Sequence, residues 1–266
     1  MTANAVTIAG SDSIGGAGIQ ADLKTFSALG VYGATVITAI TAQNIKTIRR
    51  IENVSSHMVS EQMEAVFTGL SIKAVKVGMV SSKKNIIAIA EGLSRFKNMA
   101  IIDPVMISSS GYILLDKKNI SVFKKELLPL ALMLTPNLEE AAFLTGEEKA
   151  LSEASMKRQA EKILKLGAQS VLLKGGHFHN PEESVDIFFN GKTFERLISP
   201  RIKKIQTHGT GCTLSAAITA YLAKGETILD AARKAKTYLY KSLESTKKLK
   251  ISHTGISLHH FHEWWD

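Results

Sequence analysis

Short apolar runs alternate with longer segments of helical periodicity along this chain of 266 residues. The runs rich in β-branched and aliphatic residues predict strands at 5–10, 34–41, 74–78, 98–103, 130–135 and 170–176. Between them, apolar positions spaced three and four apart predict helices, among them 18–30, 57–69 and 154–167. This alternation favours a parallel sheet that is covered by helices on both faces.

A pair of segments around residue 190 predicts an antiparallel hairpin instead. Segments 185–189 (VDIFF) and 192–198 (KTFERLI) carry strand-forming residues, and the Asn190-Gly191 pair between them is a strong turn signal. No linker-like tract and no internal repeat divides the sequence. We therefore expect a single domain over residues 1–266, of the α/β class, with a mostly parallel central sheet.

Composition and charge narrow the classes of function. The net charge is +9, but the basic residues are scattered and no nucleic-acid motif occurs, so we expect no nucleic-acid partner. A basic surface would still attract phosphorylated small molecules. We expect neither a signal peptide nor a membrane span, because no segment has the required flank or apolar length. The single cysteine, Cys212, cannot form an internal disulfide and favours a reduced, cytoplasmic setting.

Polar and glycine residues gather where the predicted strands end, which is the edge where parallel sheets bind ligands. The stretch 16–21 (GAGIQA) formally matches a dinucleotide fingerprint, but the acidic residue required about 20 positions later is missing, since none occurs between Asp22 and Glu52. Asp22 is either a helix-dipole partner or a carboxylate that accepts hydrogen bonds from a ligand amine. Gln43 is either a polar strand terminus or a donor and acceptor suited to a nitrogen heterocycle.

Several parts of a phosphoryl-transfer site are present, although no P-loop motif occurs. The stretch 208–212 (HGTGC) opens a helix, and its first amides would converge into an anion hole. These amides belong to Gly209, Thr210, Gly211 and Cys212. Lys174 ends a predicted strand, where it would neutralise phosphate charge or lie on the surface.

Three oxygen-bearing side chains at the same edge form a candidate magnesium site. Asn137 and Glu140 are three residues apart at the start of one helix, and Asp103 follows another strand. They are able to hold Mg²⁺ directly or through water. The alternatives are a turn-forming role for Asp103 before Pro104 and a helix-capping role for Glu140.

Together these stretches resemble the hydroxymethylpyrimidine/phosphomethylpyrimidine kinase family of thiamine synthesis, within the ribokinase superfamily. The resemblance is carried by 9–44, VKVGM (75–79), DPVM (103–106), TPNLEEA (135–141), LLKGGH (172–177), THGTGCTLSAAI (207–218) and LHHFHEWW (258–265). It implies a ribokinase-like three-layer αβα sandwich, ATP and Mg²⁺ as the phosphoryl donor, and a homodimer.

The same resemblance implies roles for individual residues. The pyrimidine would lie against Gly10, Asp22, Gln43 and Met79. Cys212 occupies the place where most ribokinase relatives have an aspartate base. At some positions the sequence departs from the usual family form, including 13–14 (Ser-Ile), 106–111 (MISSSG) and Gln206.

The expected activity is phosphorylation of 4-amino-5-hydroxymethyl-2-methylpyrimidine and then of its monophosphate. The alternative enzyme is a pyridoxal or pyridoxine kinase. A catalytically silent pyrimidine-binding protein is disfavoured, because a pure binder needs neither Asp103, Glu140 nor Lys174. We further expect that segment 107–115 or segment 175–184 orders over bound nucleotide.

Overall fold

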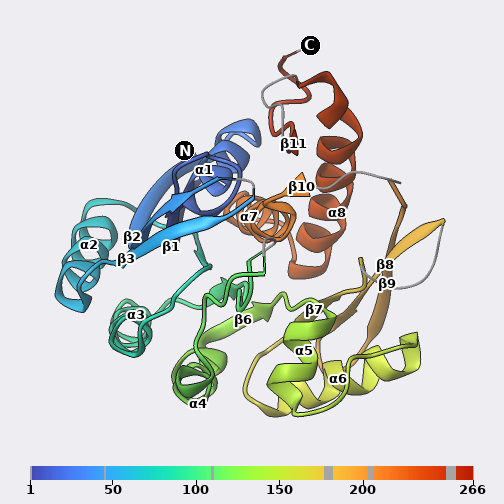
Figure 1. The fold of residues 1–266 in the computed structure, drawn as a ribbon, viewed down its shortest axis with the longest axis horizontal. Coiled ribbons are helices and arrows are strands. Elements are labelled where there is room, and N and C mark those ends of the chain that lie inside the picture. Colours follow the sequence, from blue (N-terminus) through green and yellow to red (C-terminus); the bar gives the residue numbers. More distant parts are fainter. Residues whose placement is uncertain are drawn as a thin grey trace.

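A nine-stranded sheet forms the centre of the computed structural model, which describes residues 2–44, 46–108, 111–176, 182–202, 207–249 and 256–265. The strand order is β3-β2-β1-β4-β5-β6-β7-β8-β9 (Figure 1). The strands are β1 (Asn4–Asp12), β2 (Tyr32–Gln43), β3 (Ile48–Asn53), β4 (Ala74–Val77), β5 (Ala100–Ile102), β6 (Ala131–Leu134), β7 (Val171–Lys174), β8 (Glu183–Phe189) and β9 (Phe194–Pro200). Neighbours from β2 through β1 to β7 pair in parallel, whereas β3, β8 and β9 pair antiparallel. The mostly parallel α/β fold is confirmed.

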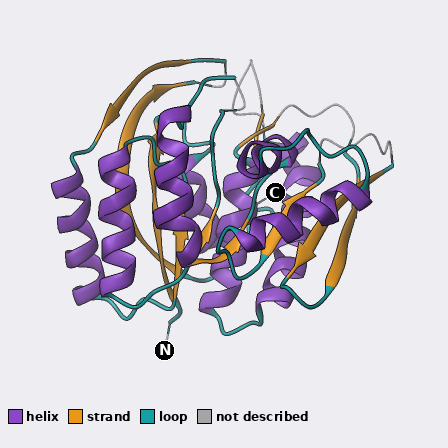
Figure 2. Cartoon of the chain, turned by 90° about the horizontal axis from the view of Figure 1, so that it is seen from below, coloured by secondary structure: helices purple, strands orange, loops and turns teal. Residues whose placement is uncertain are grey.

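Helices cover both faces of this sheet, which makes three layers (Figures 1 and 2). They are α1 (Gly18–Ala28), α2 (Ser56–Gly69), α3 (Lys83–Arg95), the short α4 (Ile120–Val122), α5 (Leu138–Thr145), α6 (Glu153–Lys165), α7 (Thr210–Ala223) and α8 (Ile228–Glu244). Alternation along the strands explains the layers: Ala100 and Ile102 belong to the core under α2, α3, α5 and α6, whereas Ile101 belongs to the core under α7 and α8. Within the described residues, no helix is long and apolar enough to cross a membrane.

The predicted hairpin is confirmed, because β8 and β9 pair antiparallel around Gly191, whose φ of 85° is in the left-handed region. Strand β3 (sequence IRRIEN) was not predicted. It pairs antiparallel with β2 at the edge of the sheet, and its charged residues hide the strand pattern. Charged edge strands are a common protection against intermolecular pairing.

A second, two-stranded sheet connects the C-terminal tail to the start of α7. Strand β10 (Thr207–His208) pairs in parallel with β11 (Ile256–Ser257). The tail then packs on the domain: the Tyr238 hydroxyl donates to the His260 carbonyl at 2.7 Å, and Trp264 Nε1 donates to the Ala28 carbonyl at 3.0 Å. These contacts hold the tail against α8 and α1, next to the strand that precedes the turn into α7.

Candidate active site

The carboxyl ends of the parallel strands bring most of the predicted residues to one edge. Gln43 ends β2, Met79 follows β4 and Asp103 follows β5. Asn137 follows β6 and Lys174 ends β7, and these two residues form an isolated bridge to each other. The edge predicted from strand order therefore exists as one continuous row.

Helix α7 begins at this row with two glycines, and a side chain at either position would disturb close contacts. Gly209 is the N-cap, with φ of 87°, and a Cβ on it would lie only 1.8 Å from the Gly16 carbonyl oxygen. A Cβ on Gly211 would lie 3.3 Å from both Asp103 Oδ2 and Lys174 Nζ. Gly209 has no side chain that could cap α7. The positive end of the helix is thus directed at the strand edge, as anion binding requires.

Asp103 and Lys174 form an ion pair at the centre of the site. Lys174 Nζ lies 2.9 Å from Asp103 Oδ1, and the side chains are 15% and 2% exposed. Thr135 Oγ1 donates to the same carboxylate oxygen at 3.1 Å. Burial alone would lower the pKa of Lys174, but the Asp103 and Glu140 carboxylates raise it above its ordinary value. Lys174 therefore carries a permanent positive charge beside the start of α7.

Asn137 and Glu140 cap helix α5, as the alternative interpretation of Glu140 predicted. Asn137 Oδ1 accepts from the Glu140 backbone N–H, and Glu140 Oε2 accepts from the Asn137 N–H, both at 2.8 Å. Burial, with the Asp103 carboxylate nearby, raises the pKa of Glu140 to about 7 against the attraction of Lys174. Two buried carboxylates thus lie near the Lys174 ammonium.

This arrangement fits a magnesium ion held mostly through water. Within the described residues no group of three acidic, histidine or cysteine side chains is placed to hold a metal ion. Mg²⁺ commonly keeps several waters and uses one or two carboxylates together with substrate phosphates. Asp103 and Glu140 offer that pair of carboxylates, and a cation beside them would relieve their repulsion.

Cys212 lies in the first turn of α7, and two helix starts meet at its sulfur. The Gly18 backbone N–H, at the start of α1, lies near the sulfur. Burial raises the pKa of the Cys212 thiol to about 11, although the Lys76 ammonium and the Gly18 N–H act in the opposite direction. The free protein therefore holds a thiol at neutral pH.

Asp22 lies in a buried ion pair, and the ligand contact predicted for it stays a prediction. Its side chain is 0% exposed and pairs with Lys76, whose Nζ lies 2.5 Å from Asp22 Oδ1. The Thr7 hydroxyl donates to the other oxygen at 2.6 Å. Each carboxylate oxygen therefore has a partner in this structure. Asp22 is the fifth residue of α1 and lies just beyond its first turn.

The other predicted pyrimidine contacts do gather near one another. A Cβ on Gly10 would lie 3.0 Å from Met79 Sδ, so these two residues touch. The Gln43 amide lies 2.9 Å from His208 Nε2, directly before the Gly209 turn. Gly10, Met79 and Gln43 thus adjoin the turn that carries Cys212.

Lys76 and His208 were missed because the sequence signals are weak. Lys76 stands in the apolar strand AVKV, where a buried charge needs a partner, but the local sequence does not identify that partner. His208 stands next to the glycine turn, but nothing local identifies its partners. Of the segments expected to order over nucleotide, residues 109–110 and 177–181 lie outside the described residues, as does Gln206.

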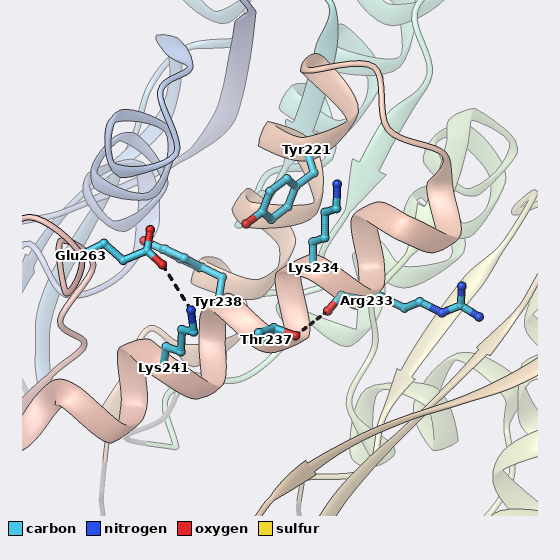
Figure 3. Close-up of a pocket in the computed structure, with 7 residues that line it drawn as sticks. All are labelled: Tyr221, Arg233, Lys234, Thr237, Tyr238, Lys241 and Glu263. Carbon is cyan, nitrogen blue, oxygen red and sulfur yellow. Dashed lines mark hydrogen bonds and ion pairs between the residues drawn. The ribbon is translucent and has the colours of Figure 1, made fainter.

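A surface pocket of about 240 Å³ lies elsewhere, between α7, α8 and the tail (Figure 3). Its wall includes Tyr221, nine residues along α7 from Cys212, which corresponds to about 13 Å at the rise of an α-helix. Its three cations are paired, Lys241 with Glu263 at 3.4 Å, Arg233 with Asp230 at 3.3 Å and Lys234 with Glu226. This pocket is separate from the strand edge.

Comparison with known proteins agrees with this geometry. The family described as phosphomethylpyrimidine kinase matches residues 12–258. The hydroxymethylpyrimidine/phosphomethylpyrimidine kinase of Rhizobium meliloti (strain 1021) is 56% identical over 100% of this chain and 99% of its own length. The crystal structure of phosphomethylpyrimidine kinase from Clostridium difficile 630 is 46% identical, with a TM-score of 0.79 over 90% of this chain and 98% of that one. Pyridoxal kinase from Staphylococcus aureus, in complex with AMP-PCP and pyridoxal, is 33% identical, with a TM-score of 0.89 over 99% and 95% of the two chains.

Proposed function

The chain belongs to the phosphomethylpyrimidine kinase family, and from this premise we propose that it phosphorylates 4-amino-5-hydroxymethyl-2-methylpyrimidine and then the resulting monophosphate, with ATP as donor. The observation that carries the proposal is the position of the Asp103–Lys174 ion pair. It lies against Gly211 at the start of α7, on the strand edge that also holds Gln43. A phosphate group and a heterocycle would both find matching groups there.

Each residue at this edge has a definite task in the proposed reaction. The amides at the start of α7 and the Lys174 ammonium bind the phosphoryl oxygens and stabilise the charge that spreads over them. The substrate hydroxyl oxygen forms a bond to the γ-phosphorus while the bond to the ADP oxygen breaks. Cys212 is proposed to receive the hydroxyl proton. Because the transition state is loose, that proton leaves late, so the small thiolate fraction of Cys212 would be sufficient as its acceptor.

Magnesium, dimer formation and location complete the proposal. Asp103 and Glu140 would hold Mg²⁺ largely through water, and the ion would supply positive charge to the phosphates. A homodimer is proposed because β2 exposes apolar side chains that a second copy would cover, with Tyr32 57% and Ile40 58% exposed. We treat residues 1–266 as one kinase domain that acts in the cytoplasm.

The experiment is ADP release from purified protein with ATP, Mg²⁺ and each alcohol in turn. We expect turnover of the pyrimidine alcohol and of its monophosphate. Lys174→Met should lower kcat on the order of a hundredfold, because a transition-state charge contact is lost. Lys149→Met is the matched control, since Lys149 pairs with Glu139 on the surface. Absence of turnover with both pyrimidines would contradict the proposal.

A pyridoxal kinase is the second candidate, and the likeness to the Staphylococcus aureus enzyme favours testing it. A pyridoxal aldehyde can add to the Cys212 thiol to form a hemithioacetal, in which the sulfur bonds to the carbonyl carbon and the thiol proton passes to its oxygen. This reaction changes the absorbance of pyridoxal, and Cys212→Ala would abolish the change. Turnover of pyridoxal above that of the pyrimidine alcohol would decide for this candidate.

A further inference from the structure

His208 joins the turn before α7 to the residue expected to read the heterocycle. It is 7% exposed and directly precedes Gly209, beside β11 (Figure 1). Its Nε2 lies 3.0 Å from Asp12 Oδ2 and 2.9 Å from the Gln43 amide. A Cβ on Gly16 would lie 2.8 Å from His208 Cδ2, so the backbone at Gly16 packs against the edge of the ring and fixes its plane.

The contact with Asp12 determines which proton His208 carries. Asp12 Oδ2 accepts from the Gly16 and Ala17 backbone N–H groups at 3.0 and 2.8 Å, and Oδ1 accepts from Ile14 at 3.2 Å. Burial alone would raise the pKa of Asp12, but the bonds to His208 and to these amides lower it. Asp12 is a carboxylate with no proton to give, so His208 Nε2 must carry the hydrogen.

That hydrogen in turn fixes the orientation of the Gln43 amide. A protonated Nε2 can only donate, and its one hydrogen is shared between Asp12 Oδ2 and the Gln43 amide, so the amide atom that faces it must be the oxygen. In the structure the amide nitrogen of Gln43 faces His208. A 180° turn about the last side-chain bond exchanges the nitrogen and the oxygen without changing the shape of the group, so the hydrogen bonds decide between the two orientations. With the nitrogen toward His208, two donors would meet at 2.9 Å.

The opposite end of the amide gives the same answer. The other amide atom lies 3.3 Å from Thr41 Oγ1. Thr41 has one hydroxyl hydrogen, and it donates this hydrogen to the Ser11 carbonyl at the shorter distance of 2.9 Å. The Thr41 oxygen is left as an acceptor, which requires the amide nitrogen of Gln43 at this end. His208 and Thr41 therefore select one orientation together.

We propose that His208 determines specificity: it holds the Gln43 amide in one orientation, so that the site accepts an aminopyrimidine and rejects the corresponding oxo-pyrimidine. This inference rests on the proposed function. The locked amide presents one N–H donor beside its oxygen acceptor, which matches a ring nitrogen beside an exocyclic amine. The oxo-pyrimidine presents a carbonyl and a ring N–H in the reverse order, and pairing with it would require the turned amide.

The test compares kcat/KM for the pyrimidine alcohol and for its 4-oxo analogue, in which a carbonyl replaces the amine. Wild-type protein should prefer the amino compound by about a hundredfold or more, because the wrong compound leaves buried polar groups mispaired. In His208→Leu this ratio should fall below about tenfold, since the amide is free to turn. The change should appear in KM for the pyrimidine and not in KM for ATP.

Companion variants separate this role from general damage. His208→Gln keeps an N–H donor near the position of Nε2 and should restore most of the ratio. Thr41→Val should lower the ratio from the other end of the amide, and it keeps the test valid if His208→Leu does not fold. His260→Leu is the matched control. His260 is 3% exposed and lies 3.1 Å from the Thr213 hydroxyl on α7, so this variant disturbs α7 but should keep the wild-type ratio.

The outcomes distinguish the two proposals. If wild-type protein phosphorylates the amino compound and the ratio is unchanged in both His208→Leu and Thr41→Val, the role of His208 is wrong and the proposed function stands. If the ratio falls equally in His260→Leu, the effect is general and the role of His208 is also wrong. If wild-type protein phosphorylates neither pyrimidine, both proposals are wrong.

Discussion

The Lys76–Asp22 ion pair should be one of the strongest pairwise contributions to the stability of this protein. Both side chains are 0% exposed and their charged atoms are 2.5 Å apart, and the Thr7 hydroxyl donates to the other carboxylate oxygen of Asp22. Removing one partner from such a pair leaves an uncompensated buried charge, which costs about 3–5 kcal/mol. Lys76→Met and Asp22→Asn should therefore each lower the melting temperature by roughly 10 °C for a chain of this size.

The double variant tests the reasoning. Lys76→Met combined with Asp22→Asn removes both charges, so it should cost about as much as one single variant, and the coupling free energy should be about 3 kcal/mol or more. Thermal and urea unfolding of the four proteins measure this quantity. The matched control is the Arg50–Glu52 pair, 78% and 69% exposed, whose coupling should stay below about 1 kcal/mol. If the effects of the Lys76 and Asp22 substitutions add to within about 0.5 kcal/mol, the pair is not coupled and the reasoning is wrong.

Three further results are expected. Gly209→Ala should lower kcat about a hundredfold, because its Cβ would lie 1.8 Å from the Gly16 carbonyl oxygen. The control is Gly225→Ala, which has a similar φ of 91° and no atom within 4 Å of the added Cβ, so it should lower stability only. Equal kcat values in the two variants would contradict this. Glu140→Gln keeps a capping side chain, so the melting temperature should not fall. It removes a carboxylate, so the Mg²⁺ concentration for half-maximal activity should rise about tenfold. An unchanged Mg²⁺ dependence would mean that Glu140 only caps the helix. The thiolate is the form of Cys212 that reacts, and the pKa of this thiol is raised to about 11. The rate of alkylation by iodoacetamide should therefore rise about tenfold per pH unit from about pH 7 to 10. A plateau in this rate below about pH 9 would refute the raised pKa.

Local patterns account for the features that were predicted correctly. A strand buried on both faces needs a continuous apolar run, so segments such as 74–78 are recognisable without any tertiary information. Parallel strands that alternate with helices place their carboxyl ends at one edge, which is why Asp103 and Lys174 could be assigned to the same site from sequence. The Asn137–Glu140 capping box was also accessible, because both partners lie within one turn.

The sequence by itself therefore determined the α/β class, the sheet edge at which the candidate site lies, the glycine turn before α7 and the family to which the chain belongs, since these depend on residues close together in the chain. Only the tertiary structure decided which side chains Asp22 and Gln43 contact. Asp22 meets Lys76 across 54 positions, and Gln43 meets His208 across 165. Such partners are chosen by the packing of α1 on β1, which is next to β4 in the sheet, and by the docking of the tail strand β11 beside β10, so no local pattern carries a signal of them. A buried carboxylate and a surface ligand contact have the same sequence signature, and they differ only in whether a distant cation reaches the carboxylate when the chain folds.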